Sequence, residues 1–469
     1  MAVNSFLFWI VYPFLFLFYW VIPSSSVKMR KWYLIVVSYL MYMSFYMRYA
    51  IILLFVTGIT FLAGNCLDKA TKRRKAIHVF FLIIALSPLF LFKYLGFFVD
   101  TVCQIIGWWG FELQPAGLRW MIPIGLSFFS IQAIGYQIDV YLQRIKAEKS
   151  FSDYTLFISF FPHIVAGPIS KASELLPQIK AKRLFDEGAC QRGFKQILWG
   201  LFLKLVIADR ANLIVSYVFD NYTFCNGGDC LLAAILYSIQ IYADFAGYSL
   251  MAIGIANTLG YQIINNFNRP YFSLSVTDFW HRWHISLSRW LKDYIYIPLG
   301  GSRCKKSRNY LNIIITFLVS GVWHGANWTF VIWGLIHGIS QVIEKAMGWQ
   351  KVVSKNALYK AWRIFVTFII ITFAWIIFRM PTLEDGIGVI VRIFTAFGAP
   401  MKVIVETDFL YLLLGLPFLV LYDIWREFQP SRLSFLNSSK VKWVVCVVLS
   451  LVILSIGMFD SGKFIYENF

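Results

Sequence analysis

Long apolar runs, separated by short basic links, dominate the pattern of hydrophobic and polar positions along the chain. Most runs are long enough to approach or cross ~30 Å of hydrocarbon as helices. The run at 310–347 is too long for one span and contains a polar break. We therefore predict an all-α polytopic membrane protein with about eleven or twelve transmembrane helices, plus re-entrant or interfacial helices near 154–169 and 279–299. The runs lie near residues 5–22, 32–47, 49–65, 76–99, 119–138, 194–218, 231–258, 310–347, 363–379, 407–423 and 441–458.

Composition supports a membrane protein and excludes an ordinary soluble domain. Hydrophobic residues make up 59% of the 469 residues and charged residues only 14%, whereas soluble domains carry about 25% charged residues. No soluble domain interrupts the spans. We expect one integral-membrane domain over 1–469, with a motif-rich core about 119–340 and peripheral helices in 1–100 and 360–469.

The net charge of +19 would suggest nucleic acid as a partner for a soluble protein. Here the lysines and arginines collect in the links, as the positive-inside rule expects, so we predict cytoplasmic links that face anionic lipid headgroups and no nucleic-acid partner. The first basic cluster follows the first span, which predicts an extracytoplasmic N-terminus. The basic links lie at 28–31, 69–75, 170–196 and 301–308 and near 345–363 and 424–442.

Cysteine and histidine spacing predicts no metal site. The seven cysteines include no CxxC pair. His281 and His284 are three residues apart, but no Asp, Glu or Cys cluster completes a ligand set. Cys225 and Cys230 lie in a link that the charge rule places outside, where they form either a disulfide or two free thiols.

A carboxylate lies in the middle of a predicted span. Gln240, Asp244 and Tyr248 recur at intervals of four and share one helix face. Ionisable residues inside a membrane are costly and mark candidate functional positions. Asp244 either orients a partner histidine or arginine, or belongs to a structural buried pair.

The polar block FWHRWHISLSRWLKDYIYIPLGGSR at 279–303 suits a membrane interface. Its tryptophans and tyrosines match the aromatic belt, and Arg289, Lys292 and Arg303 suit phosphate groups. Ordinary positive-inside charge is the alternative interpretation of these cations.

His324 lies in SGVWHGAN, between Gly321 and Gly325, with apolar helix on both sides. Ten to fifteen residues of helix separate it from the basic link, or roughly 15–20 Å, so we predict that it lies deep in the bundle. An uncharged imidazole there accepts a proton from a hydroxyl, and the glycines would leave room for a substrate. A hydrogen-bonded structural histidine is the alternative, which we favour for His337.

The segment LFISFFPHIVAGPISKASEL at 156–175 contains helix-breaking Pro162, Gly167 and Pro168. It predicts a short re-entrant or bent segment. His163 is a candidate for lining a cavity there.

Five motifs together resemble the membrane-bound O-acyltransferase family, in particular its bacterial branch of alginate O-acetylation and D-alanyl-transfer proteins. They cover roughly half the chain, and His163 departs from them because the family has glutamine at that position. The motifs are IPIGLSFFSIQAIGYQIDVY (122–141), SFFPHIVAGPI (159–169), IYADFAGYSLMAIGIANTLGY (241–261), NFNRPYFSLSVTDFWHRWHISLSRWLKDYIYIPLGGSR (266–303) and SGVWHGANWTFVIWGLIHG (320–338).

The resemblance implies a ring of tilted helices around a central funnel or tunnel. It makes His324 the general base and His284 a second catalytic residue that positions the acyl group or polarises its carbonyl. Asp244, Trp323 and Asn327 are supporting residues.

The resemblance also implies the substrates. An acyl-CoA, with acetyl-CoA preferred, or an acyl carrier protein would supply the acyl group from the cytoplasm, and Arg289, Lys292 and Arg303 would bind the phosphates of this donor. An exported SGNH-like acetyltransferase partner would pass it to an extracytoplasmic polysaccharide, and the protein would lie in the bacterial cytoplasmic membrane. The alternatives are D-alanyl transfer to teichoic acid, a proton-coupled transporter and a scaffold that only anchors the partner.

Overall fold

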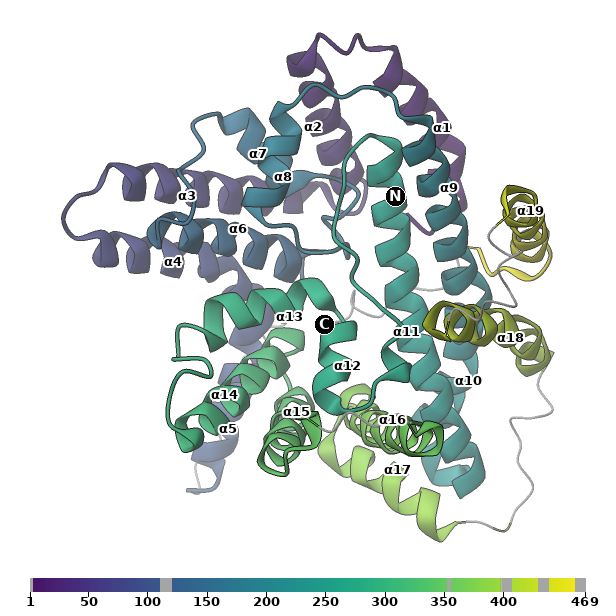
Figure 1. Ribbon diagram of the computed structural model, residues 1–469. Coiled ribbons are helices and arrows are strands. Elements are labelled where there is room, and N and C mark those ends of the chain that lie inside the picture. The colour runs from purple at the N-terminus through teal and green to yellow at the C-terminus, as the bar shows by residue number, and fades with distance from the viewer. Residues whose placement is uncertain are drawn as a thin grey trace. The chain divides into compact units, whose positions relative to one another are not determined.

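The computed structural model describes residues 3–109, 120–351, 356–396, 398, 407–428 and 438–459. All regular structure within these ranges is helical, with short 3₁₀ and π-helical turns between and within the α-helices, which confirms the predicted fold class (Figure 1). The chain forms two compact units. Unit 1 comprises Met1–Gly193, Ile255–Ile264 and Gly325–Asn327, and unit 2 comprises Phe194–Gly254, Asn265–His324 and Trp328–Phe469.

Unit 1 is built mainly from the first eight α-helices. Helices α3, α4 and α6 pack side by side in it (Figure 1). Gly64 permits the close approach of α3 and α6, because a Cβ at that position would lie 2.5 Å from the Tyr136 hydroxyl. The helices are α1 (Phe6–Val21), α2 (Val27–Met43), α3 (Ala50–Lys69), α4 (Arg74–Leu89), α5 (Leu95–Gly107), α6 (Leu126–Tyr141), α7 (Phe151–Ser159) and α8 (Ala172–Lys180).

Unit 2 contains the remaining helices, apart from the first residues of α9 and the last residues of α11. Helices α9 and α10 are joined by a π-helical turn, Leu203–Ala208, without a break. The helices are α9 (Glu187–Phe202), α10 (Asp209–Asp220), α11 (Gly227–Thr258), α12 (Val276–Arg282), α13 (Ile285–Leu291), α14 (Lys306–His324), α15 (Trp328–Ala346), α16 (Ala357–Arg379), α17 (Leu383–Thr395), α18 (Thr407–Phe428) and α19 (Ser439–Ile456).

Helices α14 and α15 form an antiparallel hairpin with closely packed backbones. Gly334 faces the carbonyl of Phe317, and Gly338 faces Ile314, where a Cβ would lie 3.2 Å from the Cα atom. Small residues allow such contact because no side chain separates the helices. Gly200 and Gly247 bring α9 and α11 together in the same way, with a Cβ at Gly200 placed 2.6 Å from the Gly247 carbonyl oxygen.

Five helical segments among the described residues are long and apolar enough to cross a membrane, and Phe6–Val21 is a shorter apolar helix. They confirm a multi-pass membrane protein, while the number of eleven or twelve spans stays a prediction. The five segments are Met47–Lys69, Arg74–Gly107, Gly227–Thr258, Ala357–Arg379 and Asp408–Phe428.

Several local predictions are confirmed. The run at 310–347 is broken between α14 and α15, and the segment after α7 is irregular up to α8. Cys225 and Cys230 are both buried and form no disulfide with each other, so the alternative of two thiols is the one observed. Residue 119 of a predicted span and residues 352–355 and 429–437 of two predicted basic links lie outside the described residues.

Candidate active site

His284 occupies a sharp turn between α12 and α13. Its φ of 42° is in the left-handed region, which residues other than glycine rarely adopt. Two backbone hydrogen bonds hold the turn against the loop that follows α11. The amide of Ile285 donates to the carbonyl of Asn266 at 2.9 Å, and the amide of Asn268 donates to the carbonyl of Arg282 at 2.9 Å. The strained backbone is therefore fixed from both sides.

The side chain of Asn266 sets the tautomer of His284. Its Oδ1 atom accepts hydrogen bonds from the Ser286 amide at 3.0 Å and the Ser286 hydroxyl at 2.9 Å, and it lies 3.2 Å from Nδ1 of His284. Because an amide oxygen only accepts, the proton of the neutral imidazole is on Nδ1 and the lone pair is on Nε2. His284 lies outside the five candidate spans, and burial lowers its pKa to about 3. The ring is neutral at pH 7.

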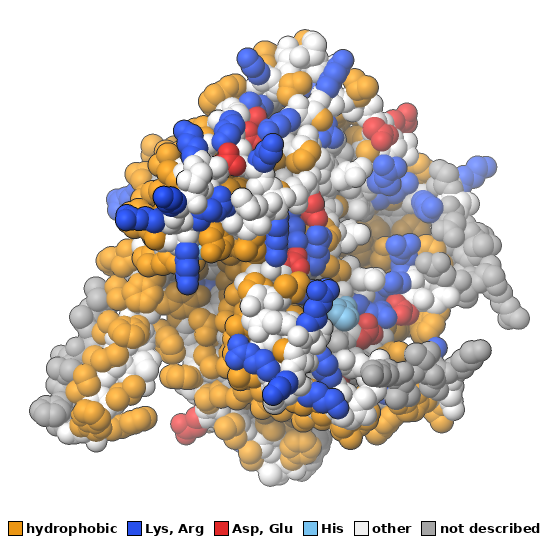
Figure 2. All heavy atoms as spheres, turned by 60° about the vertical axis from the view of Figure 1, so that its left-hand side comes forward, with side chains coloured by type: hydrophobic (Ala, Val, Ile, Leu, Met, Phe, Trp, Pro, Cys, Tyr) orange, Lys and Arg blue, Asp and Glu red, His pale blue; other side chains and the backbone are white. Residues whose placement is uncertain are grey.

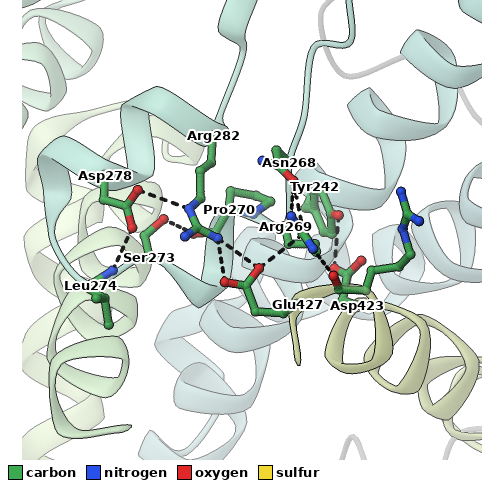
Figure 3. A network of polar contacts seen from close by, with 11 residues as sticks. Tyr242, Asn268, Arg269, Pro270, Ser273, Leu274, Asp278, Arg282, Asp423 and Glu427 are labelled. Carbon is green, nitrogen blue, oxygen red and sulfur yellow. Dashed lines mark hydrogen bonds and ion pairs between the residues drawn. The ribbon is translucent and has the colours of Figure 1, made fainter. Parts of the chain in front are cut away.

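An ion-pair network anchors this turn to α18 (Figure 3). Arg282 pairs with Asp278 at 3.1 Å on its own helix and with Glu427 at 3.1 Å. Glu427 also pairs with Arg269 at 3.2 Å, in the loop that carries Asn266. A single carboxylate thus joins the loop and α12. Buried or half-buried networks of this kind constrain geometry more effectively than isolated surface pairs.

His324 ends α14 and is only 2% exposed. Its imidazole packs edge-on against Trp333 and Phe378, with ring centroids 5.0 and 5.4 Å away. Trp323 contacts it at 4.8 Å and also contacts His284 at 6.0 Å. The structure therefore places both predicted catalytic histidines against one indole, although they are forty residues apart in the sequence.

Gly321 does not provide the space that the sequence analysis expected beside His324. It faces the carbonyl of Phe330 so closely that a Cβ at this position would clash with the oxygen. Its small size is used for the contact between α14 and α15. The expectation of open space at Gly321 is wrong, because helix packing takes up that space.

Asp244 belongs to a buried ion cluster. Its Oδ1 atom lies 2.7 Å from Nζ of Lys204, which also lies 2.7 Å from Oδ1 of Asp209. All three side chains are 4% exposed or less. Two carboxylates around one ammonium group form a strongly coupled unit that joins α11 to the continuous helix α9–α10. This arrangement matches the structural pair of the sequence analysis, with a lysine as the partner.

The predicted polar face of α11 is confirmed. Gln240 donates from Nε2 to Oδ1 of Asn212 at 2.9 Å, and the ring of Tyr248 lies 5.6 Å from Nζ of Lys204. The interval of four residues therefore identified the side of α11 that packs against α9 and α10.

Sequence reasoning missed Lys204, Asp209 and Asn266. The rule that selected Asp244 also selects Lys204, which is one of two ionisable residues in the apolar stretch LFLKLVIAD. Asn266 has no comparable signal. Its importance arises from the turn that brings it to His284.

The predicted donor-binding cations lie together along one stretch of unit 2. Arg289 is half-buried in the last turn of α13, and Lys292 and Arg303 are exposed in the π-helical turn and the loop that follow. Figure 2 shows lysine and arginine side chains far more often than acidic ones on the face that it presents. Asn327 is half-buried in the short link between α14 and α15.

Two other buried histidines, His163 and His337, do not contact Trp323 in any ring pair of the described residues, although His337 shares Trp333 with His324. His163 lies in unit 1 after α7, in a small cavity lined with Phe128, Phe129 and Gln132. His337 packs between Trp280 and Trp333, with centroids 5.2 and 4.8 Å away. Neither ring has a hydrogen-bond partner among the described residues.

No group of three or more histidine, cysteine or acidic residues that would hold a metal ion is found within the described ranges. His281 is exposed and His284 fully buried, so the pair considered in the sequence analysis does not face one ion.

Comparison with known families identifies the chemistry. The profile of MBOAT, the membrane-bound O-acyltransferase family, matches residues 38–383. The chain belongs to this family. The resemblance found in the motifs is confirmed, and with it an O-acyltransferase that is embedded in the membrane through several spans.

Three relatives show the range of acceptors within the family. The chain is 36% identical to the probable alginate O-acetylase AlgI of Pseudomonas aeruginosa, over 81% of its own length and 72% of the relative. It is 38% identical to the peptidoglycan O-acetyltransferase of Helicobacter pylori, over 66% of its own length and 63% of the relative. It is 28% identical to the teichoic acid D-alanyltransferase of Streptococcus thermophilus, over 54% of its own length and 68% of the relative. An enzyme is thus favoured over the transporter and scaffold alternatives.

Proposed function

We propose that this membrane-bound O-acyltransferase takes an acetyl group from acetyl-CoA on the cytoplasmic side of a bacterial cytoplasmic membrane and supplies it for O-acetylation of an extracytoplasmic polysaccharide. The preference for acetyl is supported by relatives named for alginate and peptidoglycan O-acetylation, which match over more of this chain than the D-alanyltransferases. Basic links on the inner side and an N-terminus on the outer side accord with the charge pattern.

The contact of His284 and His324 with one indole, Trp323, carries the proposal. His324 acts as the general base that accepts the proton of an acceptor hydroxyl. The hydroxyl oxygen forms a bond to the thioester carbonyl carbon, the carbon–sulfur bond breaks, and the proton passes to the departing thiolate. The products are an oxygen ester and free CoA. Dense aromatic packing excludes water, which would otherwise hydrolyse the thioester.

The hydrogen bonds of His284 favour a different role from that of an oxyanion donor. With its proton on Nδ1 and engaged by Asn266, the neutral ring presents a lone pair at Nε2. It accepts a hydrogen bond from the donor or the acceptor and orients that group toward His324. Trp323, whose indole N–H is a donor only, contacts both histidines and is a candidate for contact with the carbonyl oxygen.

At the cytoplasmic side, the phosphates of CoA would meet Arg289, Lys292 and Arg303. Asp244 would not contact the substrates and would act by fixing the position of α11 through its ion pair with Lys204. An exported transferase of the SGNH type would complete the transfer to the glycan. The immediate acceptor is either a hydroxyl of this partner, which then passes the acetyl group to the glycan, or a hydroxyl of the polysaccharide itself.

The proposal is tested in a deletion strain that carries the wild-type chain, His324→Ala or His337→Phe. The O-acetyl content of the purified polysaccharide is measured after mild alkaline release. We expect acetylation with the wild type and with His337→Phe and none with His324→Ala, at equal amounts of protein in the membrane. Near-normal acetylation with His324→Ala would exclude it as the base.

The donor is tested with purified protein in proteoliposomes. Consumption of acetyl-CoA in the presence of the polysaccharide and the exported partner supports acetyl transfer. Activity only with a D-alanyl carrier protein would replace this proposal with D-alanyl transfer.

A further inference from the structure

A second cavity in unit 2 is separate from the contacts of His284 and His324. It has a volume of about 480 Å³ and lies between α12 with the two residues before it, the residues after α15 and the first turns of α16. This volume falls in the range of about 300–1,000 Å³ that is typical of sites for small organic molecules. The chain therefore has room there for a ligand much larger than a single ion.

The walls of this α12–α16 cavity are held by specific hydrogen bonds. Arg363 donates from Nε to the carbonyl of Leu274 at 2.8 Å and from Nη1 to the carbonyl of Trp349 at 3.2 Å. Gln350 donates to the hydroxyl of Thr277 at 2.7 Å. The buried carboxylate of Glu344 accepts the Thr277 amide at 3.0 Å. The three elements around the cavity are therefore joined before any ligand binds.

The lining carries an excess of positive charge. Lys360 is exposed and forms no ion pair with the part of the chain that the structure describes, and Nη2 of Arg363 is likewise left for a ligand. His281 adds an exposed imidazole. The acidic residue in the lining, Asp278, is engaged on both oxygens, by Arg282 at 3.1 Å and by the Leu274 amide at 3.1 Å.

Aromatic surface borders these cations. Trp349 is 40% exposed, and the guanidinium of Arg363 lies 5.8 Å from the ring of half-buried Tyr359. Cations that neighbour an aromatic face suit a ligand with an anionic group and a flat or apolar part. A free inorganic ion would use only the cationic half of such a site.

We propose that the α12–α16 cavity binds an organic phosphate, with the phosphate at Lys360, Arg363 and His281 and the remainder of the ligand against Trp349. Two sources share this chemistry. One is a soluble nucleotide, bound at a site apart from Arg289, Lys292 and Arg303, where the proposed function places the phosphates of CoA. The other is the headgroup of an anionic lipid.

The test uses the purified full-length chain and measures binding, so that its failure is distinct from a failure of acyl transfer. Calorimetry on the protein in phosphatidylcholine nanodiscs measures the binding of the nucleotide probe, 3′-phosphoadenosine 5′-diphosphate. Native mass spectrometry in detergent measures the binding of the lipid probe, phosphatidylglycerol, and compares it with the binding of phosphatidylcholine. The variants are Lys360→Glu and His281→Gln, and Lys440→Glu is the matched control because Lys440 is an exposed lysine of α19, outside the cavity.

We expect one probe to bind the wild type and Lys440→Glu equally. We expect Lys360→Glu to weaken that binding about tenfold, because it reverses a charge at the phosphate. We expect His281→Gln to weaken it less, because the shorter amide replaces the imidazole N–H only in part. Binding of the nucleotide alone or of phosphatidylglycerol alone identifies the source. The proposal is overturned if neither probe binds, or if both cavity variants bind like Lys440→Glu. Thermal unfolding of each variant shows that it is folded, and His281→Gln carries the test if Lys360→Glu does not fold.

Discussion

The Nδ1 atom of His284 lies 3.2 Å from the Oδ1 atom of Asn266, an oxygen that also accepts the backbone amide of Ser286. The hydrogen bond from the Ser286 backbone N–H shows that the oxygen of the Asn266 side chain occupies this position, because the side-chain nitrogen would place two N–H groups against each other. The relationship therefore determines which imidazole nitrogen has the lone pair. This contact joins the turn between α12 and α13 to the loop that follows α11.

Asn266→Leu is expected to lower the acyl-transfer rate by about tenfold or more, since the wrong tautomer of an active-site histidine is strongly inhibitory. Asn266→Asp retains an acceptor and should recover part of the rate. Its carboxylate raises the pKa of His284, so this variant should lose activity at a higher pH than the wild type as the pH falls. The measurement is the pH profile of transfer for the three proteins. Identical profiles for Asp and Asn at 266 would mean that His284 is not oriented through this contact.

His337→Phe is expected to retain transfer activity and to unfold at the same or a higher temperature than the wild type. Burial of an imidazole that lacks a partner is unfavourable, and a phenyl ring fits the same aromatic surroundings. The matched change at His324, His324→Phe, should abolish transfer. The measurements are activity and thermal unfolding in detergent. If His337→Phe were inactive but folded, His337 would have a role in the chemistry.

Lys204→Met should destabilise the protein by about 3–5 kcal/mol, because it removes the cation that two buried carboxylates share. The triple variant Lys204→Met, Asp209→Asn, Asp244→Asn removes all three charges and should recover much of that stability. Thermal unfolding and the yield of folded protein from membranes distinguish the two variants. Equal stability of the single and triple variants would show that the charges of this cluster are not coupled.

Gly334→Ala is expected to reduce both thermal stability and activity, because a methyl group would clash with the carbonyl of Phe317 and separate α14 from α15 near His324. Gly58→Ala is the matched control, since a Cβ in the middle of α3 meets nothing within 4 Å. Each variant is compared by unfolding temperature and by the amount of acetylated product. A Gly334→Ala protein that matches Gly58→Ala in both would show that the helix pair tolerates separation.

The apolar runs and their basic links were sufficient to predict an all-α membrane protein, because the free energy of placing a side chain in hydrocarbon depends mainly on its type. The same rule identified Asp244 and would have identified Lys204, since charge inside a span is conspicuous whatever its partner. Spacing by four residues predicted which face of α11 packs inward, because helical geometry is local. Motifs around His284 and His324 predicted the family.

Tertiary structure alone decided how these residues act. The partner of Asp244, the use of Gly321 for packing and the shared contact with Trp323 all join positions far apart in the chain, and no local pattern specifies such distances. The tautomer of His284 depends on Asn266, a loop residue 18 positions earlier in the chain, and tertiary folding brings the two together. Sequence therefore determined which groups avoid lipid and where the helices form, while the packing of those helices determined which atom of each group is available for chemistry.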